Sequence, residues 1–196
     1  MIITDIPVYD GLLLHKRFAY NYFRKKTLPI GNIIAFRAPM NVLADGMIDS
    51  EDILQNDFIY SKDAINFCWE IPNLDPFGAV AYQRLFNTQV ASFLSTNYLL
   101  KPVEVDGDDL MVHDEFTGSD GTLQKVGKCS VSITYSKNNV ALGHTGINID
   151  AGSKAPPFAY STHLNDAQVD LFMKNVIEMF YNLNDDIFIA TTKVIC

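Results

Sequence analysis

Cysteine is scarce in this chain of 196 residues, and the three that occur, Cys68, Cys129 and Cys196, are widely spaced and form no CxxC motif. An odd number of distant cysteines does not indicate a disulfide framework, so we expect reduced thiols in a cytoplasmic protein. Long apolar runs and a charged-then-apolar N-terminal signal pattern are also missing. We therefore expect neither secretion nor a membrane partner.

Basic residues are few. Lys and Arg total 15 against 23 Asp and Glu, and the formal net charge is −8. Nonspecific binding to nucleic acid requires a broad basic surface, so we expect no nucleic-acid partner. A small local site for an anion remains compatible with this charge balance.

Common catalytic motifs are absent too. The chain has no P-loop, no GxSxG and no GxGxxG after an expected strand. Its four histidines form neither HxH nor HxxxH, so a zinc site would need distant segments, and we predict no metal. The turn containing Asp108 and Asp109 lacks the spacing of an EF-hand, and is either a solvated acidic turn or a functional loop.

What is present is a large apolar content, 48% hydrophobic and 12% aromatic, which predicts one domain over residues 1–196. Hydrophobic periodicity predicts helices over 12–26, 79–98 and 166–182, with Asn165 as an N-cap. It predicts strands over 32–39, 64–72, 128–135, 140–150 and 186–195, and a strand pair over 103–116. We predict the α+β class, with a mixed, largely antiparallel sheet flanked by helices.

Two consecutive strands carry the most informative pattern, because polar residues occupy alternate positions on each. Side chains of one parity share a face. On the first strand this set is Lys128, Ser130, Ser132 and Thr134; on the second it is His144, Gly146, Asn148 and Asp150. A lysine, hydroxyls and an asparagine on one sheet face suit an anionic ligand.

The register between these strands depends on the turn at Asn138-Asn139. A two-residue loop would place Ile133 opposite His144 and mix polar with apolar residues on each face. A slip by one residue, with an irregularity near Gly143, would place Ser130 opposite Asn148. Because register usually follows the buried face, we predict the slipped pairing.

Two cations are candidate contacts for an anion. Arg37 follows an apolar strand and can hold a carboxylate or phosphate bidentately, although a structural ion pair with an acid suits it equally well. Lys128 leads a strand of small polar residues and can act as a point charge on a carboxylate or phosphoryl oxygen. The alternative for Lys128 is an ordinary surface lysine.

The segments IIAFRAPMNV, FCWEI, AYQRLF, DGDDLMV, KCSVSITY and HTGINI together run over most of the chain. With them the sequence resembles the family called domain of unknown function 366. Residues 103–150 more distantly resemble the catalytic core of biotin and lipoate protein ligases, through Asp108-Asp109 before an apolar strand, the Lys128 strand, and Gly146-Ile147-Asn148.

This resemblance implies a fold like that of class II aminoacyl-tRNA synthetases and biotin–lipoate ligases, with a cleft over the sheet. It maps the lysine that binds the acyl carboxylate and acyl-adenylate to Lys128, with Lys125 as second choice. It also implies a carrier protein as acyl acceptor. ATP as a cofactor stays open, because the Arg- and Gly-rich adenylate loop of these ligases has no counterpart here. Cys129 lies on the apolar parity and is expected to pack rather than react.

Three functional hypotheses follow. The first is a ligase-like domain that binds a small carboxylated or phosphorylated ligand and activates or transfers an acyl group. Lys128 would be its catalytic residue, and the ligand contacts would be Arg37, Ser130, Ser132, His144, Asn148, Asp108 and Asp109. The second is a noncatalytic binding or interaction domain without adenylation chemistry. The third is a metal-dependent hydrolase that uses the acidic loop and the histidines.

Overall fold

The computed structural model describes residues 1–15, 17–24, 28–55 and 58–193. The chain begins with two short helices, α1 (Leu12–His15) and α2 (Phe18–Tyr22), followed by β1 (Asn32–Val42), α3 (Ser50–Gln55) and β2 (Ile59–Pro72). The long helix α4 (Pro76–Leu94) continues into the π-helical turn η1 (Ser95–Leu99). Five strands and a helix complete the fold: β3 (Val103–Asp106), β4 (Asp109–Thr117), β5 (Leu123–Lys128), β6 (Ser130–Lys137), β7 (Val140–Asp150) and α5 (Asp166–Thr192).

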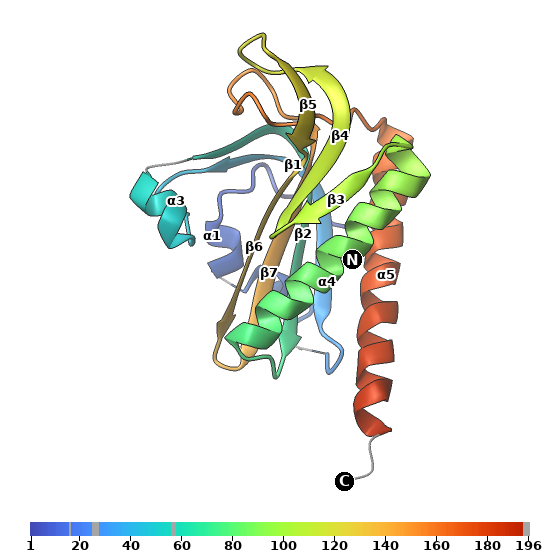
Figure 1. Cartoon of the computed structure of the whole chain (residues 1–196). Coiled ribbons are helices and arrows are strands. Elements are labelled where there is room, and N and C mark those ends of the chain that lie inside the picture. Colours follow the sequence, from blue (N-terminus) through green and yellow to red (C-terminus); the bar gives the residue numbers. More distant parts are fainter. Residues whose placement is uncertain (16, 25–27, 56–57, 194–196) are drawn as a thin grey trace.

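The strands form two antiparallel sheets, which confirms the predicted α+β class (Figure 1). The larger sheet has the order β1-β2-β7-β6, and the smaller has the order β3-β4-β5. Cys129 lies between β5 and β6, where the chain passes from one sheet to the other. Its amide donates to Leu110 O at 2.9 Å, and its carbonyl accepts from the Asn148 amide at 2.8 Å. The expected strand 128–135 is therefore divided at Cys129.

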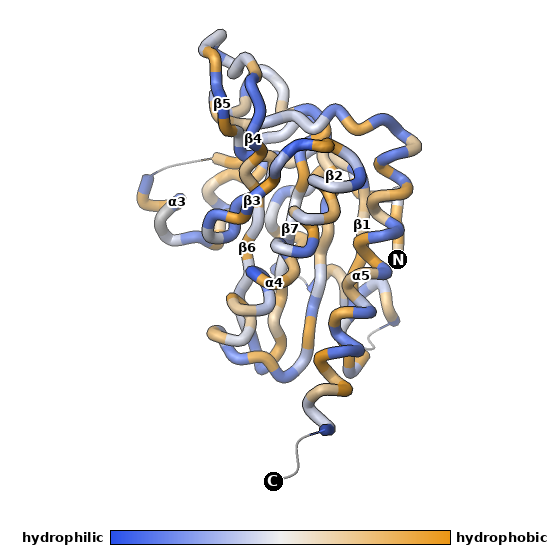
Figure 2. Tube along the Cα trace, turned by 45° about the vertical axis from the view of Figure 1, so that its right-hand side comes forward, coloured by the Kyte–Doolittle hydropathy of each residue, from blue (hydrophilic) through white to orange (hydrophobic). Residues whose placement is uncertain are grey.

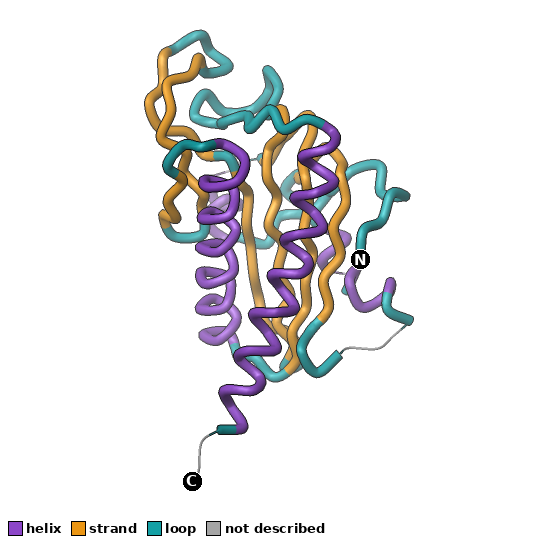
Figure 3. The backbone as a smooth tube through the Cα atoms, turned by 90° about the vertical axis from the view of Figure 1, so that its right-hand side faces the viewer, coloured by secondary structure: helices purple, strands orange, loops and turns teal. Residues whose placement is uncertain are grey.

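Helices α4 and α5 cover one face of the larger sheet and enclose the main core (Figure 3). Trp69 of β2 packs there against the rings of Tyr82 and Phe86 from α4, at centroid distances of 5.1 and 6.3 Å. Phe172 of α5 packs against Phe67 at 6.0 Å. No helix among the described residues combines the length and apolar character that crossing a bilayer requires.

The opposite face of the larger sheet is covered by the N-terminal segment. Phe18 of α2 packs against Phe36 at a centroid distance of 5.6 Å, and Tyr9 and Met40 belong to the same cluster. The segment is tied to the edge strand β1 because the Tyr9 amide donates to Pro39 O at 2.9 Å. These contacts place Tyr9 over the middle of the sheet, next to β7.

Helix α5 confirms the expected N-cap but is longer than predicted. Asn165 Oδ1 accepts from the Gln168 amide at 3.0 Å and Gln168 Oε1 accepts from the Asn165 amide at 3.0 Å, which is a capping box. The predicted strand at 186–195 is wrong, because α5 continues to Thr192, and 194–196 lie outside the described residues. Figure 2 shows hydrophobic and hydrophilic residues mixed along this helix. Residues 185–193 are all exposed, so their apolar side chains meet no sheet edge and the helical hydrogen bonds continue.

The predicted N-terminal helix over 12–26 is interrupted. Arg17 separates α1 from α2 with φ 57°, and its guanidinium Nε donates to the buried Glu70 carboxylate at 2.9 Å. Residues 16 and 25–27 of this prediction lie outside the described residues. A residue with left-handed backbone angles cannot continue a right-handed helix, so the helix is interrupted at Arg17. The interruption coincides with the long-range ion pair between Arg17 and Glu70, which the local sequence pattern did not reveal.

The predicted register between β6 and β7 is wrong. Ser130 lies opposite Ile147 and Ile133 lies opposite His144, as a two-residue loop requires, and the pairing shows no irregularity at Gly143. Asn138 and Asn139 have φ 52° and 60°, which suits a two-residue turn with both central residues left-handed. The two-residue turn sets the register even though polar residues then lie opposite apolar ones. The buried Ser132 hydroxyl of β6 is paired instead with Gln83 and Asn87 of α4, as described below.

Candidate ligand-binding site

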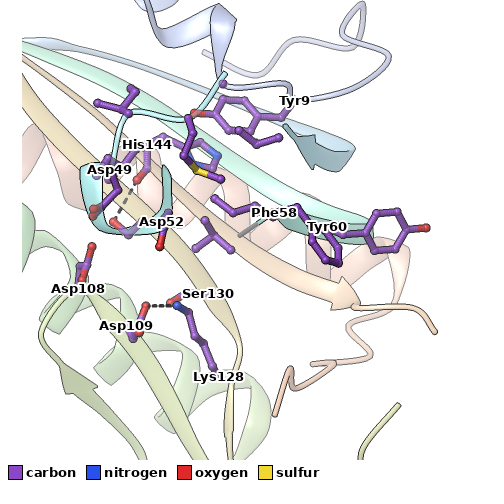
Figure 4. A pocket seen from close by; sticks show the side chains of 18 of the residues that line it. Tyr9, Asp49, Asp52, Phe58, Tyr60, Asp108, Asp109, Lys128, Ser130 and His144 are labelled. Carbon is purple, nitrogen blue, oxygen red and sulfur yellow. Dashed lines mark hydrogen bonds and ion pairs between the residues drawn. The ribbon is translucent and has the colours of Figure 1, made fainter. Parts of the chain in front are cut away.

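A cavity of about 540 Å³ lies on the face of the larger sheet that the N-terminal segment covers (Figure 4). It is bounded by β6, β7, residues 42–52 and 58–60, and the turn between β3 and β4. Its volume is within the range of small-molecule sites. Apolar side chains form much of the wall, among them Val42, Met47, Ile48, Phe58, Ile59, Val131, Ile133 and Phe158. The polar lining residues are Tyr9, Asp49, Asp52, Tyr60, Asp108, Asp109, Lys128, Ser130, Ser132, His144 and Asn148.

Lys128 is held firmly at one side of this cavity. Its amide donates to Phe158 O at 2.8 Å, and its carbonyl accepts from the Tyr160 amide at 2.8 Å. Its half-buried Nζ lies 2.8 Å from Asp109 Oδ1. Burial raises the pKa of Asp109, and the hydrogen bond from Lys128 offsets this only in part. The pair therefore presents the fixed ammonium group of Lys128 to the cavity. The partly buried carboxylate of Asp109 beside it is costly to keep charged.

The charge of the lining is negative overall. Asp49, Asp52, Asp108 and Asp109 face a single lysine, Lys128, among the described lining residues. Asp108 lies 3.8 Å from Arg84 of α4, outside hydrogen-bond distance. Among the described lining residues, Lys128 is therefore the one lysine or arginine that can balance an anionic group of a ligand.

His144 lies in β7 and is fully buried, stacked on Tyr9 with the ring centroids 3.7 Å apart. Asn66 Nδ2 donates to the carbonyls of Ala38 and Ala64 at 3.1 and 3.4 Å, so Asn66 Oδ1 is the atom 2.9 Å from His144 Nε2. Nε2 must therefore carry the proton, and Nδ1 keeps a free lone pair. Burial lowers the pKa of His144 to about 3, so the ring is neutral at physiological pH.

His144 and Asn148 share the cavity face of β7, as their common parity predicted. They lie opposite Cys68 and Ala64 of β2, which belong to the hydrophobic cluster between the larger sheet and the N-terminal segment. His144 Nδ1 and Asn148 Oδ1 are buried without a hydrogen-bond partner among the described residues. Most buried polar side-chain atoms are hydrogen-bonded, so two orphans lining one cavity distinguish this wall.

Ser130 and Ser132 lie along the cavity wall, but their hydroxyls serve the fold. Ser130 Oγ accepts from the Leu110 amide at 2.8 Å. Ser132 Oγ accepts from Gln83 Nε2 at 2.9 Å and from Asn87 Nδ2 at 3.1 Å, and it donates to His144 O at 3.0 Å. The prediction that these serines share a face with His144 and Asn148 is wrong, because Ser132 points toward α4.

We expect Ser132→Ala to lower the free energy of unfolding by about 2 kcal/mol, because it leaves buried amide donors of Gln83 and Asn87 without their acceptor. Asn148→Ala removes an amide whose oxygen has no partner in the described chain, so its expected cost is below about 0.5 kcal/mol. Urea unfolding of both variants measures the difference. Equal destabilisation would show that Asn148 has a structural partner in the free protein.

Arg37 does not reach this cavity. Its Nη2 lies 2.6 Å from Asp63 and its Nη1 lies 2.7 Å from Asp166, and both ion pairs raise its pKa. The structural ion pair considered for Arg37 is therefore present. Cys129 is buried in the main core, where burial raises the pKa of its thiol to about 12, as expected for a packing residue.

Several lining residues were missed from the sequence. No site residue was predicted between the expected strands 32–39 and 64–72, yet Met47, Asp49, Asp52 and Phe58 line the cavity. Tyr9 was missed as well. A close approach of two loops brings these parts together, since a Cβ on Gly46 would lie 2.1 Å from Asp10 O. No local pattern in the sequence indicates that approach.

The fold is that of the catalytic domains of biotin and lipoate protein ligases. A bi-partite lipoate protein ligase from Thermoplasma acidophilum matches over 92% of this chain and 83% of its own, with 9% identity and a TM-score of 0.58. Biotin protein ligase from Aquifex aeolicus in complex with biotin and ATP matches over 92% of this chain and 70% of its own, with 11% identity and a TM-score of 0.53. At such identities the likeness shows a shared fold.

The chain belongs to the family described as domain of unknown function DUF366, whose sequence profile matches residues 1–195. A protein of unknown function from Pyrococcus horikoshi has the same fold, with a TM-score of 0.81 and 21% identity over 100% of this chain and 97% of its own. A search of the curated proteins found no match.

Proposed function

We propose that this protein binds a small ligand with one carboxylate or phosphoryl group in the cavity beside β6 and β7. Lys128 contacts the anionic group, and the apolar wall holds the rest of the ligand. The observation that carries this proposal is the position of Lys128, whose half-buried Nζ reaches the cavity 2.8 Å from Asp109 while its backbone is fixed on both sides.

The electrostatics of the site support a single negative charge on the ligand. A carboxylate at Lys128 gains a charge-assisted hydrogen bond, worth roughly twice a neutral one. Asp109 accepts that bond in the free protein, and its raised pKa means that a proton is taken up there more readily than by an exposed aspartate. Proton uptake at Asp109 would release Lys128 for the ligand.

Acyl activation or transfer is the first form of this function. In biotin and lipoate ligases, which the chain resembles in fold, a lysine stabilises the charge on the acyl group and its adenylate, and the acyl group then passes to a carrier domain. Lys128 would fill that role here, with Asp108 and Asp109 on the same turn of the cavity wall. The thiol of Cys129 is a poor nucleophile because burial raises its pKa.

Noncatalytic binding is the second form, and the negative lining favours it. Lys128 is the single lysine or arginine among the described lining residues and already pairs with Asp109, so the site offers little charge compensation for a free triphosphate. A metal-dependent hydrolase gains no support, because no three His, Cys, Asp or Glu side chains group as metal ligands within the described part of the chain. The free, buried Cys68 and Cys129 agree with a cytoplasmic location.

Replacing Lys128 with glutamine is expected to weaken binding of biotin, lipoate or octanoate, whichever binds the wild type, by about tenfold to a hundredfold. That is the loss of one charge-assisted hydrogen bond. Lys62→Gln is the matched control, because Lys62 also pairs with an aspartate, Asp150 at 2.6 Å, but does not line the cavity. Isothermal titration calorimetry measures both variants.

Unchanged affinity in Lys128→Gln would refute the role given to Lys128. Native mass spectrometry of freshly purified protein adds an independent test, since a co-purified acyl or nucleotide ligand identifies the occupant directly. ATP–pyrophosphate exchange with each bound acid then separates the two forms of the function. Exchange supports acyl activation, and binding without exchange supports a noncatalytic binder.

A further inference from the structure

Tyr9 brings an unpaired hydroxyl to the side of the cavity opposite Lys128. Its side chain lines the cavity and is only 2% exposed, and its hydroxyl forms no hydrogen bond with the described residues. Unlike His144 Nδ1 and Asn148 Oδ1, the Tyr9 oxygen is not closed off by the atoms around it. A tyrosine hydroxyl usually has a hydrogen-bond partner when its ring is buried, so this hydroxyl is available to a ligand.

The backbone and the ring of Tyr9 are both fixed. Its amide donates to Pro39 O and its carbonyl accepts from the Asn41 amide, each at 2.9 Å. Its ring stacks on His144, with an interplanar angle of 9° and the centroids 3.7 Å apart. The hydroxyl therefore keeps one position, and binding a ligand to such a preorganised group costs little conformational entropy.

The Tyr9 hydroxyl stays protonated and is therefore a donor at physiological pH. Burial raises the pKa of Tyr9 well above its usual value, and the nearby Cys68 and Asp10 add to this effect. Val42 and two glycines, Gly11 and Gly46, line the cavity with Tyr9, and none of the three has a polar side chain. What matches a protonated hydroxyl in these surroundings is an acceptor on the ligand.

Tyr9 and Lys128 lie far apart in the cavity. Figure 4 shows Tyr9 with His144 on one side and the Lys128 ammonium group on the other. The Asn148 amide donates to the carbonyl of Cys129, next to Lys128, at 2.8 Å. His144 is four residues away from Asn148 along β7, or about 13 Å at the rise of a strand. A ligand that contacts both Lys128 and Tyr9 must therefore be an extended chain.

We propose that the ligand of this cavity is an extended acid whose far end carries a neutral hydrogen-bond acceptor, such as a carbonyl, that receives the Tyr9 hydroxyl. This inference rests on the proposed function for the acid end at Lys128 and adds the ligand class. Val131 and Ile133 of β6 line the cavity and suit an aliphatic middle. A second carboxylate does not fit, because Lys128 is the single lysine or arginine among the described lining residues.

Straight-chain acids of about six to twelve carbons that end in a methyl ketone test this class, each paired with the alkanoic acid of the same length. For at least one length we expect the ketone acid to bind the wild type about tenfold more tightly, as one added hydrogen bond allows. The dicarboxylic acid and the ω-amino acid of that length should both bind more weakly than the ketone acid. Tighter binding of either would overturn the neutral acceptor. Calorimetry provides the affinities.

Tyr9→Phe isolates the hydroxyl, because it keeps the ring that stacks on His144. We expect the advantage of the ketone acid to fall below about threefold in this variant, while the affinity for the alkanoic acid changes by less than about twofold. Tyr60→Phe is the matched control, since Tyr60 also lines the cavity but its hydroxyl points away from it in Figure 4. The advantage should be unchanged there.

The failures are distinguishable. If ketone and alkanoic acids bind equally at every length, or if the advantage survives in Tyr9→Phe, the ligand class is overturned, and the proposed function stands as long as binding depends on Lys128. If an acid binds but its affinity does not depend on Lys128, or if no acid binds, the proposed function is overturned and the ligand class with it.

Discussion

Gly143→Ala is expected to destabilise the protein by about 3 kcal/mol, as strong overpacking of a core does. A Cβ at Gly143 would lie 2.1 Å from Trp69 Cζ2 and 2.2 Å from Trp69 Cε2. The tryptophan ring cannot retreat easily, because it is fully buried against Tyr82 and Phe86 of α4. The strand β7 must then move, and it carries the neighbouring His144.

Urea unfolding monitored by circular dichroism measures this cost. Gly121→Ala is the control, because a Cβ there meets open space and only the positive φ of 85° is unfavourable, for which about 1 kcal/mol is expected. Combining Gly143→Ala with Trp69→Phe should cost less than the sum of the single changes, since the smaller ring leaves room. Equal effects of the two glycine substitutions would contradict the proposed clash.

Phe172→Ala is expected to cost about 3–5 kcal/mol, the usual range for deleting a buried phenylalanine ring. Phe172 is fully buried in α5, and its ring packs against Phe67 and Phe93 at 6.0 Å and against Tyr98 at 5.1 Å. Deleting it removes a contact that joins α5 to β2, to the end of α4 and to η1.

Phe188→Ala on the same helix is the matched control for this prediction. Phe188 lies in the exposed last part of α5 and is itself 50% exposed, so we expect a change below about 0.5 kcal/mol. Differential scanning calorimetry should show Tm lower by roughly 10 °C for Phe172→Ala and nearly unchanged for Phe188→Ala. Comparable losses would mean that the end of α5 is packed against something in solution.

Features of this fold that depend on short-range interactions could be predicted from the sequence. The helical spacing around Phe86 and Val90 predicted α4, and Asn165 was identified as the cap of α5. The alternation along β7 correctly put His144 and Asn148 on one face. These features follow from helix and strand periods and from capping, which involve only neighbouring residues.

Two structural predictions failed because distant groups decided the outcome. The β6–β7 register was assigned by matching polar with polar faces, but Gln83 and Asn87 of α4 supply the partners that let Ser132 be buried beside apolar neighbours. The β-branched run at the C-terminus was assigned to a strand, yet in the structure it has no sheet edge to pair with and remains in α5. Neither circumstance leaves a local trace in the sequence.

The same distinction applies to the candidate site. Residue type and parity were enough to select Lys128, His144 and Asn148 as candidates, and the chain brings all three to one cavity. Their environments follow from the tertiary structure: Asp109 against Lys128, and Tyr9 stacked on His144. Burial and hydrogen-bond partners depend on segments that are far apart in the chain. The local sequence pattern therefore indicates which side chains could bind a ligand, and the packing of the fold decides which of their atoms are left without a partner.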